Sequence, residues 1–228
     1  RLDEVPFQWT GSTRGRALPL RQPADVRALQ ARWLSHPTLP RGDAMKTLRR
    51  LSLVGVSGVG KTTLLRALAP RLTAYRCLTG SMLLRELCGE EFPRFDHMHE
   101  AHKRELREAA IRRMEQMQLE SGLHLLCDGH ATLRSRASGM IEPVFTTEDC
   151  RFFRELILIQ APASLVSARR QSDPKRQRPS AEVLVHEEIE AEAAECQRLA
   201  DCHGMRLHLL NATDPALEER FLHLLAEG

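Results

Sequence analysis

The sequence has few aromatic residues, little net charge and no long apolar run. Aromatic side chains make up 4% of its 228 residues, so the core has to be mainly aliphatic. The formal net charge of +3 at pH 7 gives no reason to expect bulk electrostatic binding to nucleic acid. No apolar run approaches the roughly 20 residues that cross a bilayer, and no signal peptide is visible. We therefore expect a cytoplasmic protein with no membrane partner.

The cysteines also lack an organised pattern. None of the six belongs to a C-x-x-C pair or to a zinc-type spacing. Reduced, partly buried thiols in a cytoplasmic protein are therefore the simplest interpretation. The content of 42% hydrophobic and 28% charged residues is ordinary for a globular protein, and the length suffices for one α/β core with extensions.

Residues 55–63, Gly-Val-Ser-Gly-Val-Gly-Lys-Thr-Thr, carry the strongest functional signal. They match the phosphate-loop pattern G-x-x-x-x-G-K-[ST], between an apolar run at 51–54 and an amphipathic stretch at 62–68. Glycines let backbone amides converge on phosphate oxygens, Lys61 would reach the β- and γ-phosphates, and the Thr62 hydroxyl would ligate Mg²⁺. We therefore expect binding of ATP-Mg²⁺ by Gly55, Ser57, Gly58, Val59, Gly60, Lys61, Thr62 and Thr63.

Strand and helix signals alternate after residue 47, which predicts an α/β fold with a five-stranded parallel sheet. The expected strands are residues 51–54, 75–78, 123–127, 156–159 and 205–210. Four helices are expected: one from the end of the phosphate loop to residue 72, one in a polar stretch around 106–117, one over 181–203 and one over 215–225. The strand at 156–159 is the most hydrophobic segment, so we expect it at the centre of the sheet. Apolar positions 183, 189, 193, 196 and 199 predict a core-facing stripe on the helix at 181–203.

Residues 1–44 differ from the rest and form an expected arm and linker ahead of a core at 45–228. Scattered prolines interrupt any long helical or strand periodicity in this segment. Residues 25–34 could form one short helix, and residues 36–43 are typical of a linker. A packed embellishment, a partner-binding segment and the tail of an upstream domain remain open alternatives.

The motifs beyond the loop separate the classes of phosphate-loop protein. A GTPase needs an Asn-Lys-x-Asp guanine reader, and the nearest match, residues 211–214, lacks the lysine. Instead, residues 128–131 read Asp-Gly-His-Ala after the third strand, and residues 169–178 read Arg-Arg-Gln-Ser-Asp-Pro-Lys-Arg-Gln-Arg. Over about residues 51–211 the sequence resembles the nucleoside-monophosphate kinases, and among them the archaeal-type adenylate kinases.

The resemblance implies an acceptor-binding insert at about 80–118 and a short lid at about 169–180. Phosphoryl transfer spreads negative charge over phosphate oxygens, which arginine forks neutralise well. Asp128, at the end of a buried strand, could hold Mg²⁺ through water, although it could also only cap a turn. The expected catalytic residues are Lys61, Asp128, Arg169, Arg176 and Arg178. The expected acceptor-binding residues are Thr79, Arg85, His130, Arg134 and Arg136.

The sequence leaves the identity of the phosphate acceptor open. The first expectation is a nucleoside monophosphate, AMP above all, which needs no general base because it is already anionic. A hydroxyl-bearing nucleoside, sugar or metabolite is the second, with Asp128 or His130 as candidate base. A nucleotide-dependent assembly factor that uses the arm is the third. His97, His99 and His102 invite a metal hypothesis, but their spacing does not place three imidazoles on one helix face, which favours a surface cluster.

Overall fold

The computed structural model describes residues 48–136, 138–173 and 178–227. The expected arm at 1–44, with its short helix and linker, lies outside the described residues, as does Arg176 of the expected lid. Within the described ranges no helix has the length and apolarity that crossing a membrane requires. All six cysteines fall in these ranges and are free.

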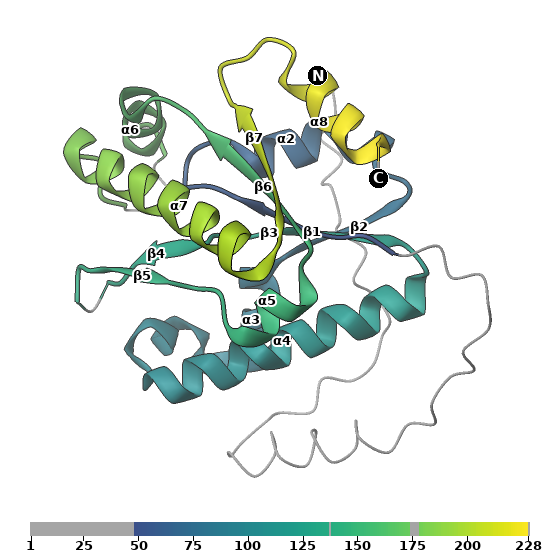
Figure 1. Cartoon of the computed structure of the whole chain (residues 1–228). Helices are drawn as coiled ribbons and strands as arrows, with labels where there is room; N and C mark the ends of the chain where they lie inside the picture. Colours follow the sequence, from purple (N-terminus) through teal and green to yellow (C-terminus); the bar gives the residue numbers. More distant parts are fainter. Residues whose placement is uncertain (1–47, 137, 174–177, 228) are drawn as a thin grey trace, which may run out of the picture. The chain divides into compact units, whose positions relative to one another are not determined.

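Five parallel strands form the main sheet in the order β2-β3-β1-β6-β7 (Figure 1). The strands are β1 (Arg50–Val54), β2 (Tyr75–Thr79), β3 (His124–Asp128), β6 (Glu155–Gln160) and β7 (Arg206–Asn211). Each expected strand is confirmed within a residue or two. The expected centre is wrong, because β1 occupies the middle and β6 lies beside it. The high hydrophobicity of β6 instead reflects burial under helices on both of its faces.

The helices are α2 (Lys61–Leu68), α3 (Gly80–Cys88), α4 (Glu100–Ser121), α5 (Thr147–Phe152), α6 (Ala163–Gln171), α7 (Glu182–His203) and α8 (Leu217–Ala226), with 3-10 turns η1 (Ala69–Arg71) and η2 (Gly89–His97). The sequence analysis did not predict α5, α6 or the antiparallel hairpin of β4 (Thr132–Arg134) and β5 (Ile141–Pro143). Both long helices, α4 and α7, end at a glycine with positive φ, Gly122 and Gly204, as helix ends commonly do.

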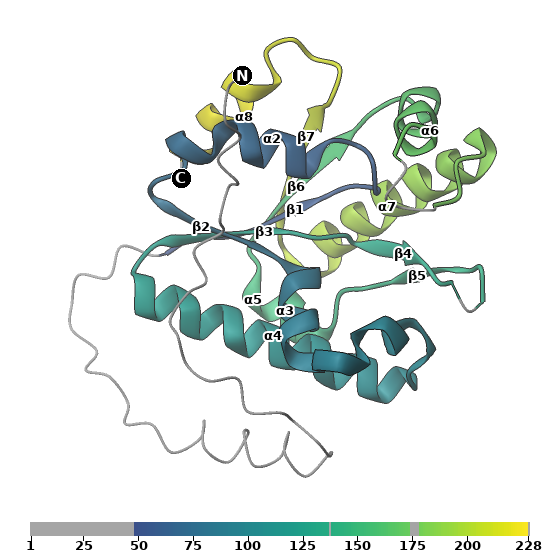
Figure 2. The same cartoon turned by 180° about the vertical axis from the view of Figure 1, so that it is seen from behind.

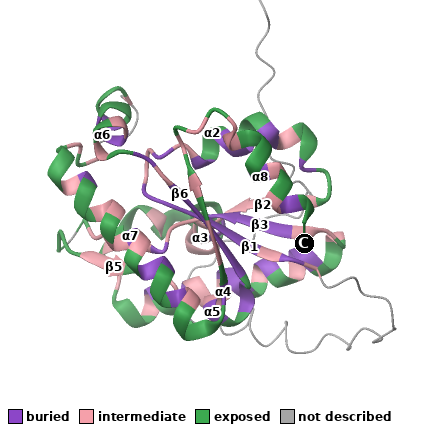
Figure 3. Ribbon diagram, turned by 45° about the horizontal axis from the view of Figure 1, so that its top comes forward, coloured by how far each residue is buried: buried purple, intermediate pink, exposed green. Residues whose placement is uncertain are grey.

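Helices cover both faces of the sheet (Figure 2). On one face α2 and α8 pack against Leu51, Leu53 and Ile157; on the other, α4 covers β3 and α7 covers β1 and β6. The central strands are accordingly buried along their length (Figure 3). One member of the predicted α7 stripe is wrong: Val183 is 65% exposed, because Val185, two residues along the helix, faces the core in its place.

A buried ion pair closes the amino-terminal edge of the sheet. Arg49 donates from Nε and Nη2 to the two Glu155 oxygens at 2.9 and 2.8 Å, and from Nη1 to the Leu225 carbonyl at the end of α8. Burial raises the pKa of Glu155, but the hydrogen bonds and charges of Arg49, His208 and Arg206 outweigh it, so that this pKa lies below 4.5. The pair therefore ties the closing helix to the strand edge.

Replacing Glu155 by glutamine is expected to lower the free energy of unfolding by about 3 kcal/mol, because a buried guanidinium loses its charged partner. Since the folded pKa lies below the unfolded one, the wild-type advantage is complete above pH 4.5 and declines as the pH falls through the lowered value. Urea unfolding from pH 3 to 8 measures it. Glu115→Gln, which removes an exposed pair with Arg50, is the control and should cost less than about 1 kcal/mol. Equal effects of the two substitutions would contradict the prediction.

Candidate active site

The phosphate loop joins the carboxyl end of β1 to the first residue of α2. Gly55, Gly58 and Gly60 have φ values of 140°, 89° and 118°, which residues with a Cβ rarely adopt. A Cβ on Gly55 would also lie 2.6 Å from the Ile159 carbonyl oxygen on β6. No side chain caps the start of α2, so its first-turn amides and the positive end of its dipole face the loop. The segment is therefore shaped as a cradle for phosphate.

Lys61 lies inside this cradle. Its side chain is 6% exposed, Nζ donates to the carbonyls of Gly55 and Val56, and it lies 4.0 Å from Asp128 Oδ1. Burial lowers the pKa of Lys61, whereas the Asp128 and Glu192 charges act in the opposite direction. Among the described residues this ammonium contacts two loop carbonyls and one carboxylate, which leaves it poised to accept an anionic partner.

Thr62 and Asp128 come together beside Lys61. The Thr62 hydroxyl donates to Asp128 Oδ2 at 2.9 Å, and Asp128 is the last residue of β3. Hydroxyl and carboxylate oxygens are the hard ligands that Mg²⁺ prefers. The residues present therefore fit both a triphosphate and its Mg²⁺: the loop holds the phosphates, and Thr62 with Asp128 would hold the cation.

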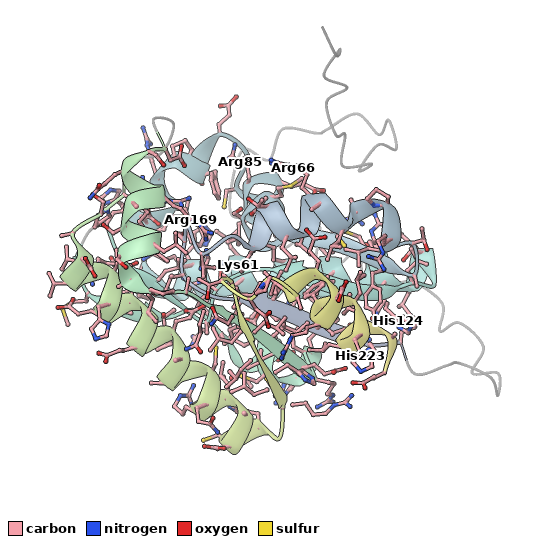
Figure 4. The ribbon with its side chains drawn as sticks, turned by 90° about the horizontal axis from the view of Figure 1, so that it is seen from above. Lys61, Arg66, Arg85, His124, Arg169 and His223 are labelled. Atoms are coloured by element: carbon pink, nitrogen blue, oxygen red, sulfur yellow. The ribbon has the colours of Figure 1, made fainter. Side chains whose placement is uncertain are left out.

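Two arginines of α6 contact the loop carbonyls. Arg169 Nη1 donates to the Val59 carbonyl at 2.7 Å, and Arg170 Nε donates to the Ser57 carbonyl at 2.9 Å. In Figure 4 Arg169 lies near Lys61, whereas His124 and His223 lie at the other end of the sheet. Arg170, which the sequence analysis did not select, is buried and pairs with Glu188. Burial is the main cause that lowers the pKa of Lys61, the charges of Asp128 and Glu192 oppose it, and the charges of Arg178 and Arg170 lower this pKa further. Arg178, at the described end of the expected lid, therefore lies near this site.

Glu192 on α7 is a second buried residue at this site that the sequence pattern did not single out. Its side chain is buried, and it accepts hydrogen bonds from the amides of Gly55, Ala131 and Thr132 at 2.8, 2.9 and 2.6 Å and from the Thr132 hydroxyl at 2.7 Å. One carboxylate thus joins the first residue of the phosphate loop to the segment after β3. A signal existed: Glu192 interrupts the apolar stripe of α7, and a charged residue at a core position is rarely accidental.

His130 lies next to this junction. Its Nδ1 is buried and makes no hydrogen bond among the residues that the structure describes. Burial and the positive charge of Lys61 lower the pKa of His130 well below 6.5. A hydrogen bond with the Gly55 backbone opposes this shift, whereas the charges of Arg178 and Arg170 add to it. The imidazole is therefore neutral at neutral pH, with a ring nitrogen able to accept a proton.

The other expected acceptor residues are spread around the insert and the hairpin. Thr79 ends β2 opposite Asp128, and Arg85 stacks over the Phe92 ring at 4.9 Å. Arg134 is held by Glu187 and Glu188 of α7, each at 2.9 Å. Arg136 is exposed and lies 3.5 Å from Asp96 of η2. The binding roles assigned to these residues, and to Thr63 in the first turn of α2, stay predictions.

The histidines of the insert make local contacts. His99 Nδ1 caps α4 by accepting from the Ala101 amide at 3.3 Å, and His102 Nδ1 lies 3.5 Å from Glu105. Within the described ranges no group of three or more histidine, cysteine, aspartate or glutamate side chains could hold a metal ion.

Comparisons with known proteins agree with this geometry. Residues 54–187, more than half of the chain, match the family described as AAA domain. Among solved structures, shikimate kinase from Acinetobacter baumannii in complex with shikimate has a TM-score of 0.54 at 19% identity, over 80% of this chain and 96% of that one. This likeness shows the fold of phosphate-loop kinases.

Two further structures match more loosely. Shikimate kinase from Bacteroides thetaiotaomicron has a TM-score of 0.48 at 18% identity, over 78% of this chain and 97% of that one. A sugar kinase from Janibacter sp. HTCC2649 has a TM-score of 0.47 at 16% identity, over 78% and 95%. No curated protein matches the chain.

Proposed function

Because the chain belongs to the AAA-domain family and has the fold of phosphate-loop kinases, we propose that it transfers the γ-phosphoryl group of ATP to a hydroxyl group of a small molecule. The observation that carries this proposal is the constellation at the loop. Lys61 lies in the glycine cradle, and the Thr62 hydroxyl is bonded to Asp128 at its mouth.

The chain's own residues perform positioning and charge neutralisation. The loop amides would hold the phosphates, Lys61 would neutralise charge on the β- and γ-phosphates, and Asp128 with Thr62 would hold Mg²⁺. When bound, Mg²⁺ withdraws negative charge from the phosphate oxygens. Arg169 lies at the loop carbonyl of Val59, from which a short reorientation of its guanidinium would bring it to a phosphate. Arg178, whose charge acts on Lys61, would add to this cationic cover and help to exclude water, whereas Arg176 lies outside the described residues.

His130 supports a hydroxyl acceptor. A hydroxyl group has to lose its proton during transfer, whereas a phosphate acceptor is already ionised. A neutral imidazole with a buried nitrogen free of hydrogen bonds to the described residues, beside Lys61, is suited to take that proton. The expectation of a nucleoside monophosphate has less support, because Arg134, the arginine expected to clamp the acceptor phosphate, is already held by two carboxylates.

A panel of acceptors tests the proposal. Purified protein with ATP-Mg²⁺ is expected to phosphorylate at least one hydroxyl-bearing nucleoside, sugar or hydroxy acid, and no nucleoside monophosphate. Formation of a nucleoside diphosphate would instead establish the adenylate-kinase type of reaction. ATP hydrolysis with no phosphorylated product from any acceptor would favour an assembly ATPase and contradict transfer.

The pH dependence tests the assigned base. If His130 takes the proton, kcat/KM should fall only as the pH drops through the lowered pKa of this group, so the plateau should extend below pH 6.5. His130→Ala should lower kcat by about 10²-fold or more and remove this acidic limb. His186→Ala, which changes an exposed histidine of α7, is the control. An unchanged limb in His130→Ala would exclude the imidazole as the base.

A further inference from the structure

A pocket separate from the phosphate loop lies between α4 and the connection from β5 to α5. Its volume is about 260 Å³, with the first turns of α4 on one side and residues 143–146 on the other. None of the residues that line it belongs to the phosphate loop, to the end of β3 or to α6. Figure 1 shows the segment that follows β5 running into α5, which lies beside α4.

Two arginines, Arg104 and Arg107, line this pocket, and neither donates a hydrogen bond to a carboxylate among the residues that the structure describes. Arg107 is partly buried, and its Nε is shielded from solvent and makes no hydrogen bond to any residue of the described ranges. Its guanidinium lies 5.8 Å from the centre of the Phe95 ring. Arg104 is more exposed, and neither arginine forms an ion pair within the part of the chain that the structure describes. A shielded guanidinium N–H without an acceptor is unusual in a folded protein.

The nearby carboxylates are occupied elsewhere. Glu100, at the edge of the pocket, is paired with Lys103, whose hydrogen bond lowers the Glu100 pKa, and the charge of Arg107 lowers this pKa too. Asp149 closes the capping box of α5, where its Oδ2 accepts from the amide and the hydroxyl of Thr146. The charge of Arg107 reaches Asp149, since it opposes the rise in pKa that burial produces there. The pocket therefore keeps an excess of positive charge.

We propose that this pocket binds the anionic group of a small organic molecule, a phosphate ester or a carboxylate. Arg107 and Arg104 supply N–H donors, and a guanidinium suits both anions because its fork matches two oxygens. Val144 and Phe145 offer apolar surface to the rest of the ligand. A cavity of about 150 Å³ already admits a benzene ring, so this one has room for an anion with a small apolar body.

Binding can be measured without turnover, so the inference does not depend on the proposed reaction. The probes are phenyl phosphate and benzoate, with phenol as the neutral match, titrated by calorimetry into the full chain. Saturating adenylyl imidodiphosphate with Mg²⁺ keeps the probes out of the phosphate loop. Both anions are expected to bind and phenol is not.

Variants assign the binding to the pocket. Arg107→Gln is expected to lower the affinity for both anions by about ten-fold or more. Arg107→Lys, which keeps the charge, should lower this affinity by a smaller factor. Arg112→Gln, an exposed arginine of the same helix, should bind as the wild type does. Circular dichroism checks that each variant is folded. Equal affinity of Arg107→Gln and Arg112→Gln, or no binding of either anion to the wild type, would overturn the proposal.

Kinetics separate two sources of the anion. If the pocket holds the anionic end of the acceptor, phenyl phosphate should compete with the acceptor, and Arg107→Gln should raise KM for the acceptor. If it holds a separate effector, phenyl phosphate should change kcat without competing. Either pattern, lost in Arg107→Gln, supports an anion pocket; the same inhibition of wild type and Arg107→Gln contradicts it.

Discussion

Replacing Lys61 by alanine is expected to lower kcat/KM by about 10³-fold or more, because one preorganised charge is removed from a site with little solvent. The ammonium lies buried in the glycine cradle, 4.0 Å from Asp128. Initial rates over a range of ATP concentrations would show the loss mainly in kcat if Lys61 acts on the γ-phosphoryl group during transfer. A rise in KM for ATP with unchanged kcat would limit Lys61 to ground-state binding.

Arg66→Ala is the matched control for this measurement. Arg66 is exposed on the same helix and points away from the loop constellation (Figure 4). Its substitution should leave kcat/KM within about two-fold of wild type, as surface changes usually do. Wild-type-like turnover in Lys61→Ala would contradict the kinase interpretation as a whole.

Replacing Glu192 by glutamine is expected to lower the free energy of unfolding by about 2–4 kcal/mol and to lower kcat as well. The carboxylate accepts four hydrogen bonds and donates none, so an amide NH₂ in place of either oxygen must face at least one N–H donor. A buried donor left without an acceptor costs about 1–3 kcal/mol, and more where a charge is lost. Because one of these donors is the Gly55 amide, the loop should lose its fixed position. Urea unfolding and steady-state kinetics measure the two effects.

Glu190→Gln separates this anchoring from a general effect of charge on α7. Glu190 is exposed on the same helix and pairs only with His186 among the described residues. Its substitution should change the stability by less than about 0.5 kcal/mol. If Glu192→Gln were as stable and as active as Glu190→Gln, the carboxylate would not be the element that positions the loop.

Local sequence patterns were sufficient for the sheet and the phosphate loop. The five main strands are five or six residues long, with apolar residues at half or more of their positions, and the loop is marked by glycines with φ values that other residues rarely adopt. The order of the strands was less accessible. Hydrophobicity measures how well a strand is covered, and β6 is as well covered beside the centre as β1 is within it.

The β4–β5 hairpin and the role of Glu192 could not be predicted from the sequence, because both depend on contacts between residues that are distant in the chain. Strands β4 and β5 have three residues each, too few to give a period. They are held by pairing with each other and by the ion pairs of Arg134 on β4 with Glu187 and Glu188 of α7. The sequence around Arg134 does not indicate whether its guanidinium binds a substrate or pairs with carboxylates of a neighbouring helix. Glu192 is similar, because its identity as an anchor depends on amides at 55 and 131 that only the fold brings to it.

The sharing of one carboxylate by three amides has a consequence for hydrogen exchange. The Gly55, Ala131 and Thr132 amides all donate to Glu192, so withdrawal of that side chain would release all of them together. They should therefore share one free energy of opening in native-state hydrogen exchange, as members of one opening unit that joins distant stretches of sequence. The start of the nucleotide cradle and the start of the hairpin would then loosen as a single event.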